Sequence, residues 1–387
     1  MAVDKVPNAP HDKATHDNAA YDKAAHDNAP HGEAAHGNAP YDVVVIGGGA
    51  GGLNAALVLA RARRRVAVVD SGSPRNAPAA HMQGFLSRDG MAPKALLEVG
   101  RAELAGYGVE IINAQVDRID RTGQPKGKPD SKADRAPAPA SDVPRFDVRL
   151  SGGPVLTTRR VLVATGLRDE LPEIPGVRER WGKDLLHCPY CHGYEVRDQP
   201  IGVLGTSPAA VQHALLLRQW SSDIVLFPHA LELAAEDRER LAARGVRIME
   251  GTVKRLVVED DRLRGVELAE GHAVPRSTVF VVPRMVPNDA LLTELGCERD
   301  DKGWVTTDRT GRTGVPGVWA VGNVVDPRAQ VVSAAGMGAA AAFALNHGLV
   351  DEDIEQAVDA YRAAIETHHA TDEHSLTPAL AATTGRQ

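Results

Sequence analysis

The sequence predicts an α/β protein with two doubly wound domains, each a parallel sheet flanked by helices. Two observations support this prediction. From residue 41, YDVVVIGGGAGG is followed by the apolar stretch LNAALVLARA and then by RVAVVD, which is the order strand, turn, helix, strand. From residue 199, QPIGVLGTSPAAVQHALLL followed by SDIVLF repeats this order. Two such units predict two α/β domains within one chain.

Length, charge and cysteine content limit the function. At 387 residues the chain can form two or three domains, each with its own core. A net charge of -7 argues against a nucleic-acid partner, which would select a basic surface. No apolar run is long enough to span a membrane and no secretory signal is visible, so we expect a cytoplasmic protein. Three cysteines are too few to form a disulfide scaffold, so their expected role is redox or metal chemistry.

Composition also marks the domain boundaries. Residues 1–40 repeat about every ten residues and contain almost nothing apolar beyond alanine, which predicts a disordered His-, Ala- and Asp-rich tail. Residues 121–142 are rich in Pro, Lys, Asp and Ala, so we expect a mobile surface loop. A long Ala-rich helix is expected to end near Arg362. We assign the first domain to residues 41–175 and 284–365, the central domain to 176–283, and a C-terminal tail to 366–387.

The first unit carries a glycine motif directly after its strand. Gly47 permits a tight turn, Gly49 lets the backbone approach a pyrophosphate, and Gly52 lets helix and strand pack closely. Asp70 ends the next strand, where a carboxylate accepts a hydrogen bond from a ribose hydroxyl. Strand, glycines, helix and acid together predict a dinucleotide site.

The run HCPYCH, residues 187–192, is the chemical centre of the sequence. Two residues between Cys188 and Cys191 suit a redox disulfide. The same run matches a c-type haem attachment signature, and its cysteines and histidines offer four zinc ligands. Haem attachment normally takes place outside the cytoplasm, and adjacent residues do not easily converge on one tetrahedron. We therefore favour redox chemistry and expect no metal.

Several segments resemble those of the low-molecular-weight thioredoxin reductases, over about residues 41–362. VLVATG and TGVPGVWAVGNV resemble the later signatures of FAD-binding disulfide reductases, although Asn323 stands where that family has an acid. AQVVSAAGMG resembles the segment that opens a helix facing the flavin. The resemblance implies FAD, a homodimer, substrate exchange at Cys188 and a flavin-proximal sulfur at Cys191. The residues expected to bind the cofactor are Gly47, Gly49, Gly52, Asp70, Val116, Thr165, Gly166, Gly322, Asn323, Gln330 and Val331.

The resemblance breaks in the second unit, where reductases bind NADPH. Of the glycine motif only Gly205 remains, and Ser207 stands where the backbone should meet the pyrophosphate. The arginine-rich segment of reductases is replaced by FPHALE, residues 227–232, with no arginine to pair a 2′-phosphate. We therefore do not expect productive NADPH binding.

The run CPYCHGYE, residues 188–195, resembles the FAD-dependent dithiol oxidases that close disulfides in natural products such as gliotoxin, holomycin and romidepsin. This resemblance implies that a small-molecule dithiol is oxidised to an intramolecular disulfide, with O2 giving H2O2. His192 replaces the acid of reductases and is the expected base, with simple ordering of the loop as the alternative. Tyr190 is expected to contact substrate; His81 either lines the substrate cavity or, as the favoured interpretation, is an ordinary surface histidine. The alternatives are a thioredoxin-type disulfide reductase fed by NADPH or a donor such as ferredoxin, and a binding scaffold without turnover.

Overall fold

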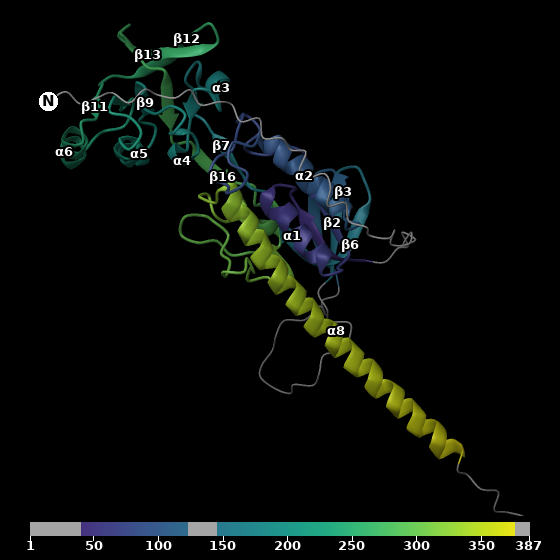
Figure 1. The fold of residues 1–387 in the computed structure, drawn as a ribbon. Coiled ribbons are helices and arrows are strands. Elements are labelled where there is room, and N and C mark those ends of the chain that lie inside the picture. Colours follow the sequence, from purple (N-terminus) through teal and green to yellow (C-terminus); the bar gives the residue numbers. More distant parts are fainter. Residues whose placement is uncertain (1–39, 123–144, 376–387) are drawn as a thin grey trace, which may run out of the picture. The chain divides into compact units, whose positions relative to one another are not determined.

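The computed structural model describes residues 40–122 and 145–375, with side chains through residue 365 (Figure 1). The expected tail before residue 40, most of the expected loop at 121–142 and the last twelve residues of the expected C-terminal tail lie outside the described residues. Within the described ranges, no helix is long and apolar enough to cross a membrane.

The first unit forms a seven-stranded sheet in the order β3-β2-β1-β6-β5-β4, with β17 also paired to β6. Strands β1, β2, β3, β6 and β17 run parallel, whereas β4 and β5 are antiparallel to their neighbours. The strands are β1 (Tyr41–Ile46), β2 (Val66–Asp70), β3 (Glu110–Asn113), β4 (Val116–Thr122), β5 (Arg145–Leu150), β6 (Val155–Val163) and β17 (Val318–Ala320).

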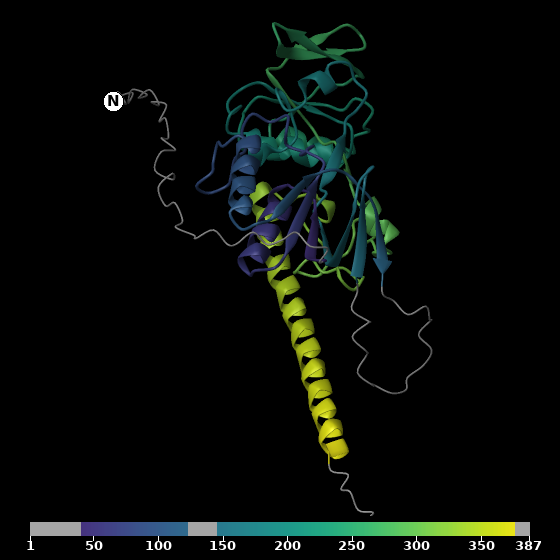
Figure 2. The same cartoon turned by 90° about the vertical axis from the view of Figure 1, so that its right-hand side faces the viewer.

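The alternation of side chains along β1 explains which elements cover each face of this sheet. Val43 and Val45 belong to a buried cluster with helices α1 (Ala50–Arg61) and α8 (Val331–Ser375), which pack against each other (Figures 1 and 2). Helix α2 (Pro93–Ala105) contributes Leu104 to the same cluster. Val44 and Ile46 point to the other face, where they join β4, β5 and α7 (Ala290–Glu294). The period of two puts successive valines on opposite sides of the sheet.

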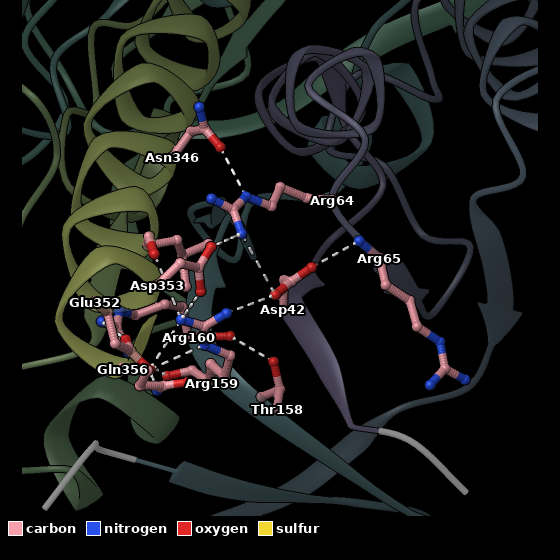
Figure 3. A network of polar contacts seen from close by, with 11 residues as sticks. Asp42, Arg64, Arg65, Thr158, Arg159, Arg160, Asn346, Glu352, Asp353 and Gln356 are labelled. Carbon is pink, nitrogen blue, oxygen red and sulfur yellow. Dashed lines mark hydrogen bonds and ion pairs between the residues drawn. The ribbon is translucent and has the colours of Figure 1, made fainter. Parts of the chain in front are cut away.

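Helix α8 is longer than expected, since it continues past Arg362 to Ser375. The sequence has no Gly or Pro between Gly348 and Pro378, so nothing local ends the helix near Arg362. A network of charged side chains ties α8 to the sheet (Figure 3). Arg160 on β6 pairs with the buried Glu352 at 2.6 Å, and Arg159 pairs with Asp353 at 2.7 Å.

The second unit forms a five-stranded sheet in the order β11-β10-β9-β15-β8, parallel throughout. Its strands are β8 (Leu185–Leu186), β9 (Ile201–Leu204), β10 (Ile224–Phe227), β11 (Arg247–Ile248) and β15 (Thr278–Val281). Helices α5 (Ala209–Leu217) and α6 (Ala235–Ala243) join one buried cluster with this sheet. A second cluster includes a small antiparallel sheet of β12 (Val253–Glu259), β13 (Arg262–Leu268) and β14 (Ala273–Pro275).

The chain passes between the two units through a two-stranded antiparallel ribbon, β7 (Leu167–Glu170) with β16 (Arg284–Pro287). The remaining short helical elements are α3 (Val177–Arg180), α4 (Pro189–His192) and the 3₁₀ turn η2 (Gly322–Val324). The prediction of two parallel α/β units is confirmed, with β9, α5 and β10 forming the second unit where the sequence places it.

Candidate active site

A cavity of about 1530 Å³ lies at the carboxyl ends of the strands of the first sheet. It begins where β1, β2, β6 and β17 end, and it continues to the cysteine run at residues 187–192. Ligands of open α/β sheets bind at this edge. Ordinary ligand pockets have about 300–1,000 Å³, so the cavity has room for a dinucleotide and a second molecule.

The turn after β1 forms a cradle that only small residues allow. Gly47 has φ +108°, a conformation that favours glycine, and a Cβ on Gly52 would lie 1.9 Å from the Gly47 carbonyl oxygen. A Cβ on Gly49 would meet nothing within 4 Å, and Gly49 both lines the cavity and precedes the first turn of α1. The open space at a helix N-terminus fits the pyrophosphate of a dinucleotide.

Asp70 lies at the end of β2 and lines the same cavity. Its carboxylate accepts a hydrogen bond from Gly48 N at 3.1 Å and pairs with Arg101 of α2. These contacts hold the acid beside the glycine turn, the position in which a ribose hydroxyl is expected.

The two later signatures also border the cavity. Thr165 Oγ1 donates to the Asn288 carbonyl oxygen at 2.7 Å, and Gly166 and Gly322 have φ +68° and +74°. Asn323 Nδ2 donates to two carbonyl oxygens of its own loop, at 2.9 and 3.0 Å. The Asn323 amide is therefore fixed, with Oδ1 turned away from those carbonyls. All the expected cofactor residues line the cavity except Gly52, which packs behind it, and their roles stay predictions.

Arg75 and Asp169 form an ion pair in the cavity that sequence reasoning missed. Arg75 Nε and Nη2 each donate to an Asp169 carboxylate oxygen at 2.7 Å, and Arg75 Nη1 lies 3.4 Å from Asn323 Oδ1. The positive charge of Arg75 also acts to lower the pKa of Cys191, although larger effects outweigh it there. A lone arginine in a loop gives no periodic signal, and its partner lies 94 residues away.

Cys188 and Cys191 are free thiols at the start of α4 and line the cavity. Contact with the Cys191 side chain lowers the pKa of Cys188 to about 6, and backbone N–H groups of Cys191 and Tyr190 act in the same direction. The contact with Cys188, together with burial, raises the pKa of Cys191. Cys188 is therefore the sulfur that ionises first in the reduced pair.

Three histidines, His187, His192 and His213, line the cavity together with the cysteine pair. Burial lowers the pKa of His192, and its Nδ1 is buried without a hydrogen-bond partner. The rings of His187 and His213 stack at a centroid distance of 5.8 Å, and burial lowers the pKa of both, that of His213 to about 4. All three rings are therefore neutral near pH 7.

The two expected substrate residues lie at the cavity surface. Tyr190 is 71% exposed and its ring makes an edge contact with Trp220 at 5.6 Å. His81 lines the cavity, but its Nδ1 is 3.0 Å from the Gly90 carbonyl oxygen of its own loop. Cys297 is buried in the core of the first unit, away from the cysteine pair. Among the described side chains, no group of three or more His, Cys, Asp or Glu residues is arranged to hold a metal ion.

The matching turn of the second unit differs at the second position of the glycine motif. The first position is crowded in both units, since a Cβ on Gly205 would lie 2.5 Å from the Pro228 carbonyl oxygen and one on Gly47 would lie 2.4 Å from the Ala164 carbonyl oxygen. Ser207 stands where the first unit has Gly49, and its Oγ is buried without a hydrogen-bond partner. His229, which stands in the place of the arginine-rich segment, accepts a hydrogen bond from Val253 N at 3.0 Å through Nδ1, and Leu231 packs on the core. These residues serve the packing of the second unit.

Comparisons with known proteins agree with this geometry. Residues 41–342 match the family model for pyridine nucleotide-disulphide oxidoreductases. A probable thioredoxin reductase of Arthroderma benhamiae is 30% identical over 73% of this chain and 74% of its own length. Thioredoxin reductase sirT of Leptosphaeria maculans is 29% identical over 81% of this chain and 96% of its own length. The crystal structure of HlmI is 72% identical with a TM-score of 0.79, covering 84% of this chain and 98% of HlmI.

The fold and the site thus define a flavin-dependent oxidoreductase that acts on thiols and disulfides. The chain belongs to the pyridine nucleotide-disulphide oxidoreductase family. The expected likeness to thioredoxin reductases is confirmed.

Proposed function

We propose that the protein binds FAD and oxidises a small-molecule dithiol to an intramolecular disulfide, with O2 as the electron acceptor. The balanced reaction is R(SH)2 + O2 → R(S–S) + H2O2. The observation that carries the proposal is the contrast at the second position of the two turns: a Cβ on Gly49 would meet open space, whereas Ser207 places a buried side chain at the matching position. Electrons that cannot enter from a nicotinamide must enter through the cysteine pair.

The first chemical step is attack on the oxidised cysteine pair. A substrate thiolate attacks Cys188 Sγ, a mixed disulfide forms, and Cys191 leaves as a thiolate. A free thiol has a pKa of about 8.5, so attack near pH 7 needs a base. We assign this role to His192, because its ring is neutral near pH 7 and its Nδ1 has no hydrogen-bond partner.

The second step closes the product disulfide. The second substrate thiolate attacks the substrate sulfur of the mixed disulfide, and Cys188 leaves as a thiolate. A leaving thiol with a low pKa leaves faster, and the pKa of Cys188 is about 6. The two electrons of the substrate now reside in the reduced pair.

The residues around the glycine turn fit FAD. Gly47, Gly49 and Asp70 would hold the pyrophosphate and a ribose, and the fixed amide of Asn323 would face the ribityl chain. Bound FAD supplies two-electron transfer between the cysteine pair and O2. The protein contributes the exchange sulfurs, the base and the Arg75–Asp169 charges beside them.

An oxygen-electrode assay with small dithiols tests the proposal. We expect stoichiometric O2 uptake and H2O2 release with a dithiol, unchanged when NADPH is added. A dithiol and a monothiol of similar structure form a matched pair, because only the dithiol can close an intramolecular disulfide. No O2 uptake with any dithiol, together with NADPH-dependent reduction of a disulfide, would overturn the proposal.

A thioredoxin-type disulfide reductase is the second candidate, because relatives of this chain carry that name. With Ser207 in the turn of the second unit, such an enzyme would take electrons from a donor such as reduced ferredoxin. Anaerobic reduction of the flavin by ferredoxin, with slow turnover of small dithiols, would favour this candidate.

We also propose a homodimer. The exposed part of α8 carries an apolar stripe at intervals of three and four residues, which places its side chains on one helix face: Val350, Ile354, Val358, Tyr361 and Ile365. A second copy of the chain is expected to cover this stripe. Light scattering should give the mass of a dimer for the wild type and of a monomer for the double variant Ile354→Glu, Tyr361→Glu. A monomeric wild type would contradict the proposal.

A further inference from the structure

The side chain of Gln330 spans the two sulfurs of the cysteine pair. Gln330 Oε1 accepts a hydrogen bond from Cys191 Sγ at 3.2 Å, and Gln330 Nε2 donates to Cys188 Sγ at 3.6 Å. Sequence reasoning expected this residue at the cofactor, and nothing local links it to cysteines 139 and 142 positions away.

The backbone of Gln330 is fixed, so this contact does not depend on a free loop. The Gln330 carbonyl oxygen accepts the hydrogen bond from Ala334 N at 2.8 Å, which is the first helical bond at the start of α8. Asn323 Nδ2 holds the carbonyl oxygen of the preceding residue, Ala329. The start of α8 therefore presents the amide to the sulfurs from a defined position.

A primary amide is asymmetric, with an acceptor oxygen at one end and donor N–H groups at the other. A hydrogen-bond acceptor favours the protonated form of a thiol, whereas a donor favours the thiolate. The oxygen faces Cys191 and the nitrogen faces Cys188. The nitrogen end of the amide thus matches a reduced pair in which Cys188 is charged.

We propose that Gln330 is a catalytic residue of the thiol–disulfide exchange, which fixes the negative charge of the reduced pair on Cys188. Its Nε2–H stabilises the Cys188 thiolate. In dithiol oxidation, this makes Cys188 the better leaving group when the product disulfide closes, a consequence that rests on the proposed function. The charge assignment itself holds for either direction of exchange.

Further support comes from the acidity of Cys188. The pKa of Cys188 is lowered to about 6, first by Cys191 and with contributions from backbone N–H groups and from Gln330. The pKa of Cys191 is raised by its contact with Cys188 and by burial, and Gln330 does not contribute to this rise. Two thiols that are both partly buried and only three residues apart thus differ in the direction in which their pKa moves.

Alkylation of the reduced holoenzyme tests the assignment without turnover. Dithionite-reduced protein is treated anaerobically with iodoacetamide from pH 5 to 10, and each cysteine is read by peptide mass spectrometry. In the wild type Cys188 should react first, with a midpoint near pH 6. In Gln330→Leu the midpoint should rise by about one unit, because a hydrogen bond to a charged group is lost. At pH 6.5 this slows the alkylation of Cys188 about threefold, whereas the rates converge above pH 9.

Gln330→Glu should shift the midpoint further, because it loses the donor and adds a negative charge. Gln219→Leu is the matched control, since Gln219 is exposed and lies outside the cavity, and its midpoint should equal that of the wild type. Flavin absorbance reports whether each variant keeps its cofactor. An unchanged Cys188 midpoint in Gln330→Leu, or faster alkylation of Cys191 than of Cys188 in the wild type, would overturn the assignment. If the wild-type protein takes up no O2 with any dithiol, the proposed function is contradicted. The alkylation result does not depend on that outcome.

Discussion

The first turns of the two α/β units share a topology and differ in what they can hold. The first glycine of the motif, Gly47 or Gly205, is crowded by a carbonyl oxygen in both units. At the second position a Cβ on Gly49 would meet open space after β1, whereas Ser207 has a buried side chain after β9. His229, in the segment that follows β10, is tied to the backbone of β12. The same βαβ element thus serves as a ligand cradle in one unit and as packed scaffold in the other. The fold alone therefore does not show that a unit binds a nicotinamide dinucleotide, and the space left at the turn after the first strand is needed as evidence.

The largest expected effect comes from closing the open turn. Gly52→Ala puts a methyl group 1.9 Å from the Gly47 carbonyl oxygen, so we expect little folded protein and no bound flavin. Gly49→Ala is the matched control, because its backbone has φ −79° and its Cβ meets nothing within 4 Å. This variant should fold normally yet lose flavin, which absorbance per protein and circular dichroism distinguish. A fully flavinated Gly49→Ala protein would show that the cradle does not hold the cofactor.

The cysteine variants test where electrons enter. Cys188→Ser and Cys191→Ser should each abolish dithiol turnover but differ in absorbance. Removing Cys188 takes away the largest cause of the raised pKa of Cys191, so the Cys191 thiolate should give a long-wavelength charge-transfer band with oxidised flavin. In Cys191→Ser the flavin spectrum should be unperturbed, and Cys188 should be trapped as a mixed disulfide with substrate. Normal turnover in both variants would remove the pair from the mechanism.

His192→Asn should lower turnover by on the order of 10²–10⁴ at neutral pH while flavin and fold are kept. The wild-type ring is the free base above its lowered pKa, so wild-type activity should fall as the pH drops through that pKa. In the variant, activity should return at pH 9, where substrate thiols ionise without a base. Equal rates for variant and wild type at pH 7 would assign the base elsewhere, with His81 as the next candidate.

A smaller effect is expected on stability. The pKa of His213 is lowered by burial to about 4, below its ordinary value of 6.5. Between these values the unfolded chain binds the proton and the folded chain does not, so stability falls as the pH drops from 6.5 to 4. His213 accounts for up to about 3 kcal/mol of this loss. Urea unfolding of His213→Leu at pH 7.5 and 4.5 should show a smaller difference than the wild type; an identical difference would exclude His213 as the cause.

Sequence reasoning located what depends on short stretches of chain. The turn glycines could be identified from the sequence, because the positive φ at Gly47 and the close backbone approach at Gly52 are local requirements that favour glycine. It could not find the Arg75–Asp169 pair or the contact of Gln330 with both sulfurs, because those partners are 94 to 142 residues apart. The end of α8 was placed too early because the helix changes from an Ala-rich to a charged sequence without a breaker.

Anaerobic stopped-flow reduction of the bound flavin tests the central claim most directly. The wild-type protein is mixed with a small dithiol in one experiment and with NADPH or NADH in the other, and bleaching of the flavin band is followed. The turn of the second unit, with the buried Ser207 at its second position, predicts that the dithiol reduces the flavin orders of magnitude faster than either nicotinamide. Fast bleaching by NADPH would contradict the account and place the protein among the NADPH-dependent reductases.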